Sequence, residues 1–266
     1  MSSSTYRKLP KILAAGLAIG CAGGYYAYKN SNKPPGLNPE IYAPFTVNKI
    51  TELTSDASLF SLVPQSPSEH LTTLEPIAKV TIRDPSMQVQ RPYTPLYLDA
   101  NELKFFIRKY EEGPVSSYIH SKKEGDTIEL RGPFKTTKLD CTKYPRIVAI
   151  VAGTGIAPIY QLAQSVKSPV DIVYCSRPGQ PPLLKEELEK ECPNVRVKSV
   201  QNRLVNIHDI LDWDNVTVPL KDTLCIVCGS QKFVSTIAGP KADYGARQGE
   251  VKGLLSNNPF GKVWKL

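Results

Sequence analysis

The stretch Arg91-Pro92-Tyr93-Thr94-Pro95-Leu96 places a cation, an aromatic ring and a hydroxyl within four residues. The run before it, Met87-Gln88-Val89-Gln90, alternates apolar and polar residues, which predicts a half-buried strand. Because side chains alternate between the faces of a strand, Arg91 and Tyr93 are expected on one side. A phosphate-pairing guanidinium beside a flat ring suits a flavin dinucleotide. The alternative is a strand that ends in a turn, since prolines cannot donate ladder hydrogen bonds.

Two glycine-containing segments add anion sites. Gly113-Pro114-Val115-Ser116 opens a helix expected up to His120, and its small residues leave backbone amides free to face an anion. The alternative here is a glycine turn before a capped helix. Further on, the apolar strand 146–151 runs into Gly153-Thr154-Gly155-Ile156-Ala157-Pro158 and then a helix. A strand, a glycine turn and a helix in this order bring the phosphates of a dinucleotide to a helix N-terminus.

The spacing of the strands divides the chain. Short strands separated by turn residues predict an antiparallel barrel over residues 41–139. Strands that alternate with helices predict a doubly wound parallel sheet over residues 140–266. The strands expected in the two domains cover residues 45–50, 77–82, 103–107 and 127–131, and then 146–151, 170–174, 195–200 and 223–228, with a charged helix over 182–191.

Arg91-Pro92-Tyr93-Thr94 resembles the flavin motif Arg-x-Tyr-Thr/Ser of the ferredoxin-NADP reductase superfamily, in its NADH-cytochrome b5 reductase branch. The resemblance implies that Arg91 holds the FAD pyrophosphate, that Tyr93 packs on the flavin and that Thr94 hydrogen-bonds its redox edge. Ser116 matches the serine whose amide and hydroxyl hold the pyrophosphate in that family. The motif often continues with Ser or Asn, where this chain has Leu96 and Tyr97.

Gly153-Thr154-Gly155 likewise resembles the nicotinamide-nucleotide motif of this superfamily. The family has Cys-Gly-Pro after a later strand, with the cysteine beside the nicotinamide, and this chain has Cys228-Gly229-Ser230. The resemblance therefore implies FAD as cofactor, NADH or NADPH as hydride donor, and Thr94 and Cys228 as the catalytic pair. Ser176-Arg177 follows the second strand of the domain, where Arg177 either holds the 2′-phosphate of NADPH or is a solvated loop arginine.

The cysteine pattern predicts thiols without metal. Cys225 and Cys228 form a Cys-x-x-Cys motif, but side chains three residues apart on a strand point to opposite faces of the sheet. This argues against a redox disulfide or half of a zinc site between them.

The positive charge of the chain is concentrated at its start. The net charge is +8, and five of the 33 lysines and arginines precede Gly36, which leaves 28 against 25 acidic residues. The remaining chain is only mildly basic, so the composition gives no indication of nucleic-acid binding. Ile12–Tyr28 is uncharged and largely apolar, close to the lower limit for a membrane-spanning helix, about 17 residues.

Basic residues flank this apolar stretch, and Gly16, Gly20 and Gly24 form a small-residue stripe along it. We expect residues 1–28 to be a targeting segment and retained membrane anchor, with a cleaved signal peptide as the alternative. The acid-free start also resembles a mitochondrial import sequence. Residues 29–40 are expected to be a linker to the folded domains.

One segment of the first domain and three C-terminal segments resemble a single family more closely. Residues 105–113, 238–241, 248–256 and 263–266 resemble a fungal mitochondrial flavoprotein family, the cytochrome c mitochondrial import factors. In several superfamily members an aromatic near the C-terminus covers the flavin, and Trp264 is the candidate here. The alternative for Trp264 is burial at the sheet edge.

Together these features predict a membrane-anchored, FAD-dependent NAD(P)H oxidoreductase that passes electrons to haem or a haem protein. The resemblance implies a role in haem attachment to cytochrome c, with cytochrome c and its haem lyase as partners. It also implies a single-pass protein of the mitochondrial inner membrane that faces the intermembrane space. The first alternative is a NADH-cytochrome b5 reductase, and the second is a non-catalytic membrane assembly factor that keeps the flavin fold.

Overall fold

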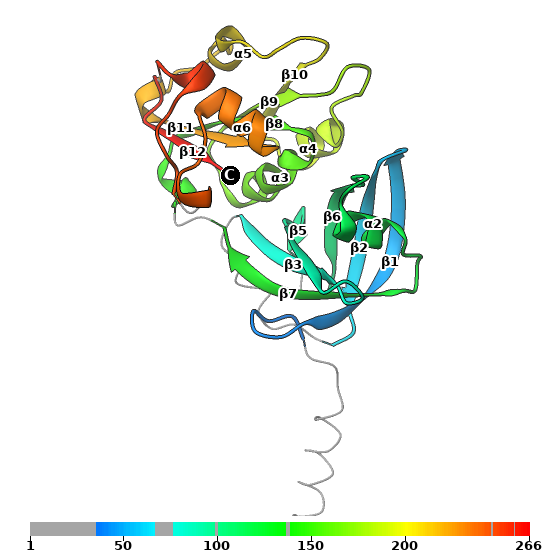
Figure 1. Cartoon of the computed structure of the whole chain (residues 1–266). Helices are drawn as coiled ribbons and strands as arrows, with labels where there is room; N and C mark the ends of the chain where they lie inside the picture. Colours follow the sequence, from blue (N-terminus) through cyan, green and yellow to red (C-terminus); the bar gives the residue numbers. More distant parts are fainter. Residues whose placement is uncertain (1–35, 67–76, 99–100, 137–138, 246, 258) are drawn as a thin grey trace, which may run out of the picture.

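The computed structural model describes residues 36–266 except 67–76, 99–100, 137–138, 246 and 258 (Figure 1). These residues form two domains, each built on its own sheet (Figure 1). None of the helices in the described residues is long and apolar enough to cross a membrane. The expected anchor, residues 12–28, and most of the expected linker lie outside the described residues.

The first domain is a seven-stranded sheet in the order β4-β3-β7-β1-β2-β6-β5, and its paired strands are antiparallel. The antiparallel sheet expected from the strand spacing is therefore confirmed. Among the described residues, its pairings run from β4 at one edge to β5 at the other, without a pairing between these two strands that would close the expected barrel. The strands are β1 (Ala43–Thr54), β2 (Ala57–Pro64), β3 (Ala78–Asp84), β4 (Val89–Tyr93), β5 (Tyr97–Leu98), β6 (Leu103–Arg108) and β7 (Thr127–Lys135).

The core of this domain follows the alternation of the strands. In β3, Val80 and Ile82 are buried, whereas Thr81 between them is half-buried. Helix α2 (Pro114–His120) adds Val115 and Ile119 to the same apolar cluster. The helix expected after Gly113 is thus confirmed, and it is fixed against the inner face of the sheet.

The second domain is a five-stranded parallel sheet in the order β10-β9-β8-β11-β12. Alternate residues of β8 pack on opposite faces: Ile147 and Ala149 join the cluster of α3 and α4, and Val148 joins the cluster of α5 and α6. The predicted doubly wound sheet is confirmed. Its elements are β8 (Arg146–Ala152), α3 (Ile156–Ser165), β9 (Val170–Cys175), α4 (Lys185–Glu191), β10 (Val195–Val200), α5 (Ile207–Leu211), β11 (Thr223–Cys228), α6 (Gln231–Ala238) and β12 (Lys262–Lys265), with short 3-10 turns at Cys141–Lys143, Gly153–Gly155, Leu220–Asp222, Asp243–Gly245 and Gly253–Leu255.

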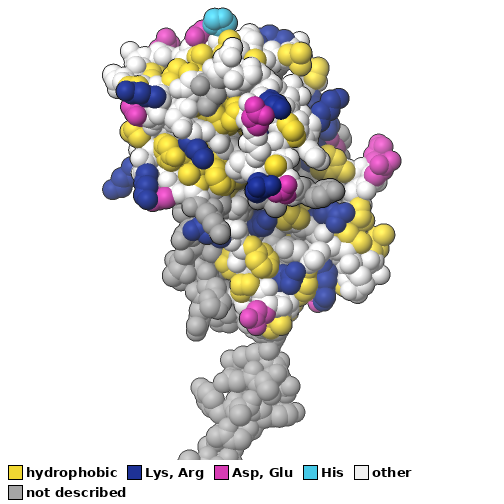
Figure 2. Space-filling view, turned by 60° about the vertical axis from the view of Figure 1, so that its left-hand side comes forward, with side chains coloured by type: hydrophobic (Ala, Val, Ile, Leu, Met, Phe, Trp, Pro, Cys, Tyr) yellow, Lys and Arg dark blue, Asp and Glu magenta, His cyan; other side chains and the backbone are white. Residues whose placement is uncertain are grey.

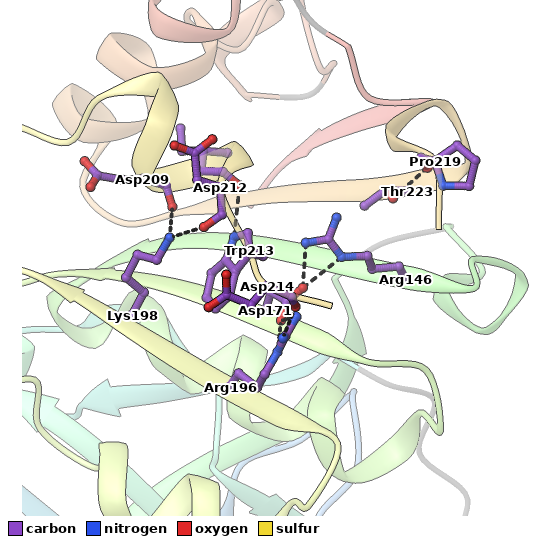
Figure 3. Close-up of polar contacts among 11 residues, drawn as sticks. Arg146, Asp171, Arg196, Lys198, Asp209, Asp212, Trp213, Asp214, Pro219 and Thr223 are labelled. Carbon is purple, nitrogen blue, oxygen red and sulfur yellow. Dashed lines mark hydrogen bonds and ion pairs between the residues drawn. The ribbon is translucent and has the colours of Figure 1, made fainter. Parts of the chain in front are cut away.

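A buried ion-pair network joins three strands at the end of this sheet where the strands begin (Figure 3). Asp171 of β9 is 0% exposed and accepts hydrogen bonds from Arg146 Nε at 2.8 Å and Arg196 Nε at 2.7 Å. A buried carboxylate without such partners costs several kcal/mol, on the order of 3–5. The network therefore fastens β8, β9 and β10 together at the edge opposite their carboxyl ends.

Direct hydrogen bonds hold the two domains against each other. Gln161 of α3 is 5% exposed, and its Oε1 accepts from the Ala78 amide at 2.5 Å. Its Nε2 donates to the carbonyls of Ala78 at 3.1 Å and Pro95 at 2.9 Å. The helix that begins after the glycine turn is thereby bonded to the residue that follows Thr94.

A second interdomain contact is built on tyrosines. The hydroxyls of Tyr97 and Tyr160 lie 3.0 Å apart, and Tyr160 donates to Glu191 Oε2 at 2.6 Å. Lys104 Nζ lies 2.9 Å from Glu187 Oε1 in the same region. Two elements of each domain are therefore linked by polar groups close to the ends of β5 and α4.

Candidate functional site

A cleft of about 610 Å³ lies between the domains, and we call it the interdomain cleft. One wall is formed by the end of β4, by β6 and by the start of α2, and the other by the turns after β8 and β11. Its lining residues are Arg91, Pro92, Tyr93, Thr94, Phe106, Ile107, Arg108, Tyr110, Glu112, Gly113, Pro114, Val115, Ser116, Thr154, Gly155, Ala157, Pro158, Cys228, Gly229 and Ser230.

Arg91 and Tyr93 share one face of β4, as the alternation predicts. In the antiparallel pairing of β4 with β3, Arg91 is opposite Ile82 and Tyr93 is opposite Val80. Arg91 is exposed, and its Nη1 donates to the carbonyl of Gln90 at 2.8 Å. Tyr93 is half-buried, and this burial raises the pKa of its hydroxyl to about 12. Tyr93 therefore presents a neutral ring beside a guanidinium.

The start of α2 is a closed turn. Ser116 is buried, its Oγ donates to the carbonyl of Gly113 at 2.9 Å, and it accepts from the amide of Tyr110 at 3.1 Å. A Cβ atom on Gly113 would lie 2.5 Å from Ser116 Oγ, so a larger residue there would displace the Ser116 hydroxyl from this turn. The Ser116 hydroxyl holds this turn together, and its contact with the FAD pyrophosphate stays a prediction.

The turns after β8 and β11 meet at the opposite wall. Gly153 has a φ of +55°, a left-handed conformation that favours glycine. Cys228 is 8% exposed, and burial raises the pKa of its thiol to about 12 although Lys241 acts in the opposite direction. Because the thiolate is the reactive form, Cys228 is an unreactive neutral thiol at neutral pH. Cys225 faces the opposite side of the sheet from Cys228, as its position three residues earlier predicts.

A second hollow, about 890 Å³, continues from the cleft, and we call it the β9 hollow. Arg108, Tyr110, Thr154 and Ser230 line both, so the two are contiguous. The turns at the carboxyl ends of four parallel strands contribute most of its walls. Its remaining lining residues are Ala152, Gly153, Tyr174, Cys175, Ser176, Arg177, Pro178, Gln180, Pro181, Leu183, Asn202, Arg203, Leu204, Val205, Phe233, Thr236, Ile237, Gly253 and Leu254.

The two hollows bring together every site residue expected from the sequence except Trp264. Trp264 lies in the edge strand β12, opposite Ile226, and packs against the core on the α3 side. It lines neither hollow, so the structure favours burial at the sheet edge over a cover for the flavin.

Two residues that the sequence reasoning missed line both hollows, Arg108 and Tyr110. Arg108 is 6% exposed at the end of β6, where its Nη1 pairs with Asp56 and its Nη2 donates to Gln180 Oε1 at 3.3 Å. The sequence shows only that Arg108 directly ends an apolar strand. Because its partners Asp56 and Gln180 are distant in sequence, its position between the domains could not be predicted from this pattern.

The residues of the interdomain cleft fit FAD. Arg91 is exposed and donates a hydrogen bond to the backbone carbonyl of its neighbour Gln90, so its guanidinium is available for a pyrophosphate. Tyr93 offers a ring and Thr94 a hydroxyl on the same wall, and Gly113 and Gly155 also line the cleft. A guanidinium, an aromatic ring and backbone amides beside glycine are the groups that a flavin dinucleotide site requires.

Comparisons with known proteins agree with this assignment. Residues 44–139 match the family described as oxidoreductase FAD-binding domain. The chain is 26% identical to NADH-cytochrome b5 reductase 2 of Candida albicans over 94% of this chain and 90% of the other. It is 27% identical to the protein of the same name from Saccharomyces cerevisiae (strain YJM789), over 98% of this chain and 97% of the other. The chain is similar to these NADH-cytochrome b5 reductases over nearly its whole length.

A third relative extends the comparison. NADH-cytochrome b5 reductase 2 of Scheffersomyces stipitis is 32% identical, over 65% of each chain. With this FAD-binding domain and these relatives, the chain is a flavoprotein NAD(P)H reductase of the cytochrome b5 reductase type. Its cofactor is FAD and its reductant is NAD(P)H.

Solved structures share the fold of this chain. The cytochrome b5 reductase domain of Ulva prolifera nitrate reductase superposes with a TM-score of 0.61 at 18% identity, over 87% of this chain and 100% of that one. Flavohemoglobin from Malassezia yamatoensis, solved with bound FAD and heme, superposes with a TM-score of 0.64 at 16% identity, over 90% of this chain and 62% of that one. Both domains of the present chain therefore follow a known two-domain arrangement.

Proposed function

We propose that this chain passes electrons from NAD(P)H through FAD to a haem protein of the cytochrome b5 type. The observation that carries the proposal is the interdomain cleft, where Tyr93 and Thr94 of one domain face Gly155 and Cys228 of the other. A cleft with a flavin wall and a nicotinamide wall is what hydride transfer between two rings requires.

The chain's own residues have distinct roles in this proposal. Arg91 and the closed turn before α2 hold the FAD phosphates, and Tyr93 and Thr94 orient its ring system. Gly153 and Gly155 let the backbone approach the nicotinamide dinucleotide, and Cys228 packs beside the nicotinamide without adding charge. FAD, when bound, accepts a hydride and releases electrons one at a time. The protein supplies position and exclusion of water rather than an acid or base.

The nature of the electron acceptor rests on two unequal arguments. The three relatives named above are NADH-cytochrome b5 reductases by name, which favours a b5-type acceptor. The role in haem attachment to cytochrome c, with its haem lyase as partner, rests on the resemblance of residues 105–113, of the C-terminal segments and of the expected anchor. Lysine and arginine side chains are spread over both domains on the face shown in Figure 2, so this face presents no single charged strip that selects a partner.

The acceptor is tested by steady-state reduction of cytochrome b5, free haem and cytochrome c by the FAD-loaded protein. The proposal predicts that cytochrome b5 is reduced fastest. Faster reduction of free haem or cytochrome c would support the haem-attachment role instead. A colourless protein that cannot be reconstituted with FAD would favour the non-catalytic assembly factor. The Arg91→Ala protein, which is expected to lose FAD, is the control for flavin-independent reduction.

We further propose that residues 12–28 anchor the protein in the mitochondrial inner membrane, with residues 36–266 in the intermembrane space. The support is the apolar, acid-free N-terminal sequence with basic flanks. Mitochondrial fractionation with alkaline carbonate extraction is expected to leave the protein in the membrane pellet. Protease should degrade it once the outer membrane is opened, and release by carbonate would contradict the anchor.

A further inference from the structure

The β9 hollow carries an excess of positive charge. Of the described residues that line it, three are arginines, Arg108, Arg177 and Arg203, and none is an aspartate or glutamate. Arg203 is neutralised by Asp209, which it meets through two bonds of 2.7 and 2.5 Å. The other two arginines share a single carboxylate, Asp56. One guanidinium charge at the hollow is therefore left uncompensated.

Arg177 forms a weaker ion pair with Asp56 than Arg108 does. Arg108 is buried and pairs closely with this carboxylate. Arg177 has a side chain that is 60% exposed, and its Nη1 lies 3.4 Å from Asp56 Oδ2. An ion pair that is long and exposed contributes little, roughly 0–1 kcal/mol. Arg177 is thus free to turn toward an anion in the hollow while Arg108 continues to hold Asp56.

The position of Arg177 indicates which anion this is. Ser176 and Arg177 directly follow β9, at the carboxyl end of the strand beside β8. In doubly wound dinucleotide domains an acidic residue near this position bonds the ribose 2′-hydroxyl of NAD, whereas an arginine accommodates the 2′-phosphate of NADP. The segment 175–181 contains no acidic residue. The Ser176 hydroxyl also has no hydrogen-bond partner among the described residues, although its oxygen is buried.

We propose that the β9 hollow selects the nicotinamide dinucleotide with a 2′-phosphate, and that Arg177 and Ser176 hold that phosphate. This inference rests on the proposed function, because it concerns the hydride donor of the same reaction. It departs from the relatives, whose names specify NADH. A guanidinium binds phosphate through paired, charge-assisted hydrogen bonds, and a rotated serine hydroxyl adds a further donor.

The test measures binding of two probes to the FAD-loaded full-length protein by calorimetry, 2′,5′-ADP and 5′-AMP. The wild-type protein is expected to bind 2′,5′-ADP more tightly, and Arg177→Ala is expected to reduce this affinity ratio roughly 10- to 100-fold. Arg177→Lys, which keeps the charge, should retain part of the ratio. Lys190→Ala removes the same charge from an exposed position outside the hollow and should leave the ratio at the wild-type value.

A second measurement separates this inference from the proposed function. Anaerobic mixing with NADPH or NADH reports the rate of flavin bleaching, and NADPH is expected to be the more efficient donor. If the flavin is bleached but both probes bind equally, or if Arg177→Ala weakens both probes by the same factor, the inference is wrong and the function stands. If neither donor bleaches the flavin, the proposed function itself is wrong.

Discussion

Gly155 and Cys228 touch backbone to backbone on one wall of the interdomain cleft. A Cβ atom on Gly155 would lie 2.5 Å from the carbonyl oxygen of Cys228 and 2.9 Å from the amide nitrogen of Gly229. Such distances are too short for any side chain, and the atoms in contact are backbone atoms that cannot rotate away. The two turns that form the nicotinamide wall are therefore in contact because residue 155 is glycine.

Gly155→Ala is expected to separate these two turns. The overpacking should cost about 1–3 kcal/mol of unfolding free energy and slow the bleaching of the flavin by NAD(P)H. Thermal unfolding and anaerobic stopped-flow absorbance measure the two effects. Gly125→Ala is the control for flavin reduction, because its positive φ makes alanine strained while its position lies outside both hollows. Equal flavin reduction rates in the Gly155→Ala and wild-type proteins would contradict the close contact.

Gln161→Leu is expected to weaken the contact between the domains. It leaves the amide and carbonyl of Ala78 and the carbonyl of Pro95 without their side-chain partner. An unsatisfied buried polar group costs about 1–3 kcal/mol, so the melting temperature should fall clearly. Gln164→Leu, which removes one bond of 3.3 Å to Leu96, should have a much smaller effect. Similar melting temperatures for the two variants would show that Gln161 does not fasten the domains.

Arg91→Ala is expected to release FAD. Loss of a charge-assisted phosphate contact should cost about 1.5–3 kcal/mol of binding free energy, or roughly 10- to 100-fold in affinity. The measurement is the flavin content after dialysis. Arg83→Ala is a matched control, since Arg83 lies on the neighbouring strand and pairs with Glu129 at 2.6 Å outside the cleft. Full retention of flavin by the Arg91→Ala protein would show that Arg91 does not bind FAD.

Buried thiols are expected to make the protein sensitive to alkaline pH. Burial raises the pKa of Cys228 to about 12 and that of Cys141 to about 11, against about 8.5 in an unfolded chain. The folded state then holds protons that the unfolded state has released, so stability is complete below about pH 8.5 and falls as the pH rises toward 12. Unfolding free energies measured over this range should decrease, and Cys228→Ala should show a smaller decrease. An identical pH slope would argue against a raised thiol pKa.

Trp264→Ala is expected to destabilise the protein without changing its use of the nicotinamide. Trp264 is half-buried in β12 and packs on the α3 side of the sheet, so truncation should cost about 3 kcal/mol. Thermal unfolding and the KM for the nicotinamide donor measure the two effects. A nearly unchanged melting temperature with an altered KM would support Trp264 as a cover for the flavin.

Features that depend on local patterns were correctly predicted from the sequence. The shared face of Arg91 and Tyr93 follows from the period of two along a strand. The continuous apolar run in β8 follows from burial on both faces of a parallel sheet. The helix expected over 182–191 begins at Lys185 instead, because Leu184 before it adopts a left-handed conformation with φ of +66°.

Features that depend on distant partners were not predicted. Strand β2 (Ala57–Pro64) was missed; its first six residues are all buried, because β1 and β6 flank it and both of its faces are covered. The bonds of Gln161 join residues 83 and 66 positions apart, and no local pattern records them. The place of Trp264 likewise depends on the pairing of β12 with β11, which is set by the folded sheet.

The central claim is that NAD(P)H reduces FAD held in the interdomain cleft. The most direct measurement is an anaerobic titration of the purified, FAD-reconstituted protein with NADPH and with NADH, followed by flavin absorbance. We predict about one flavin per chain and its complete bleaching by a stoichiometric amount of at least one donor. A protein that binds no flavin, or whose bound flavin keeps its absorbance with both donors in excess, would contradict the claim.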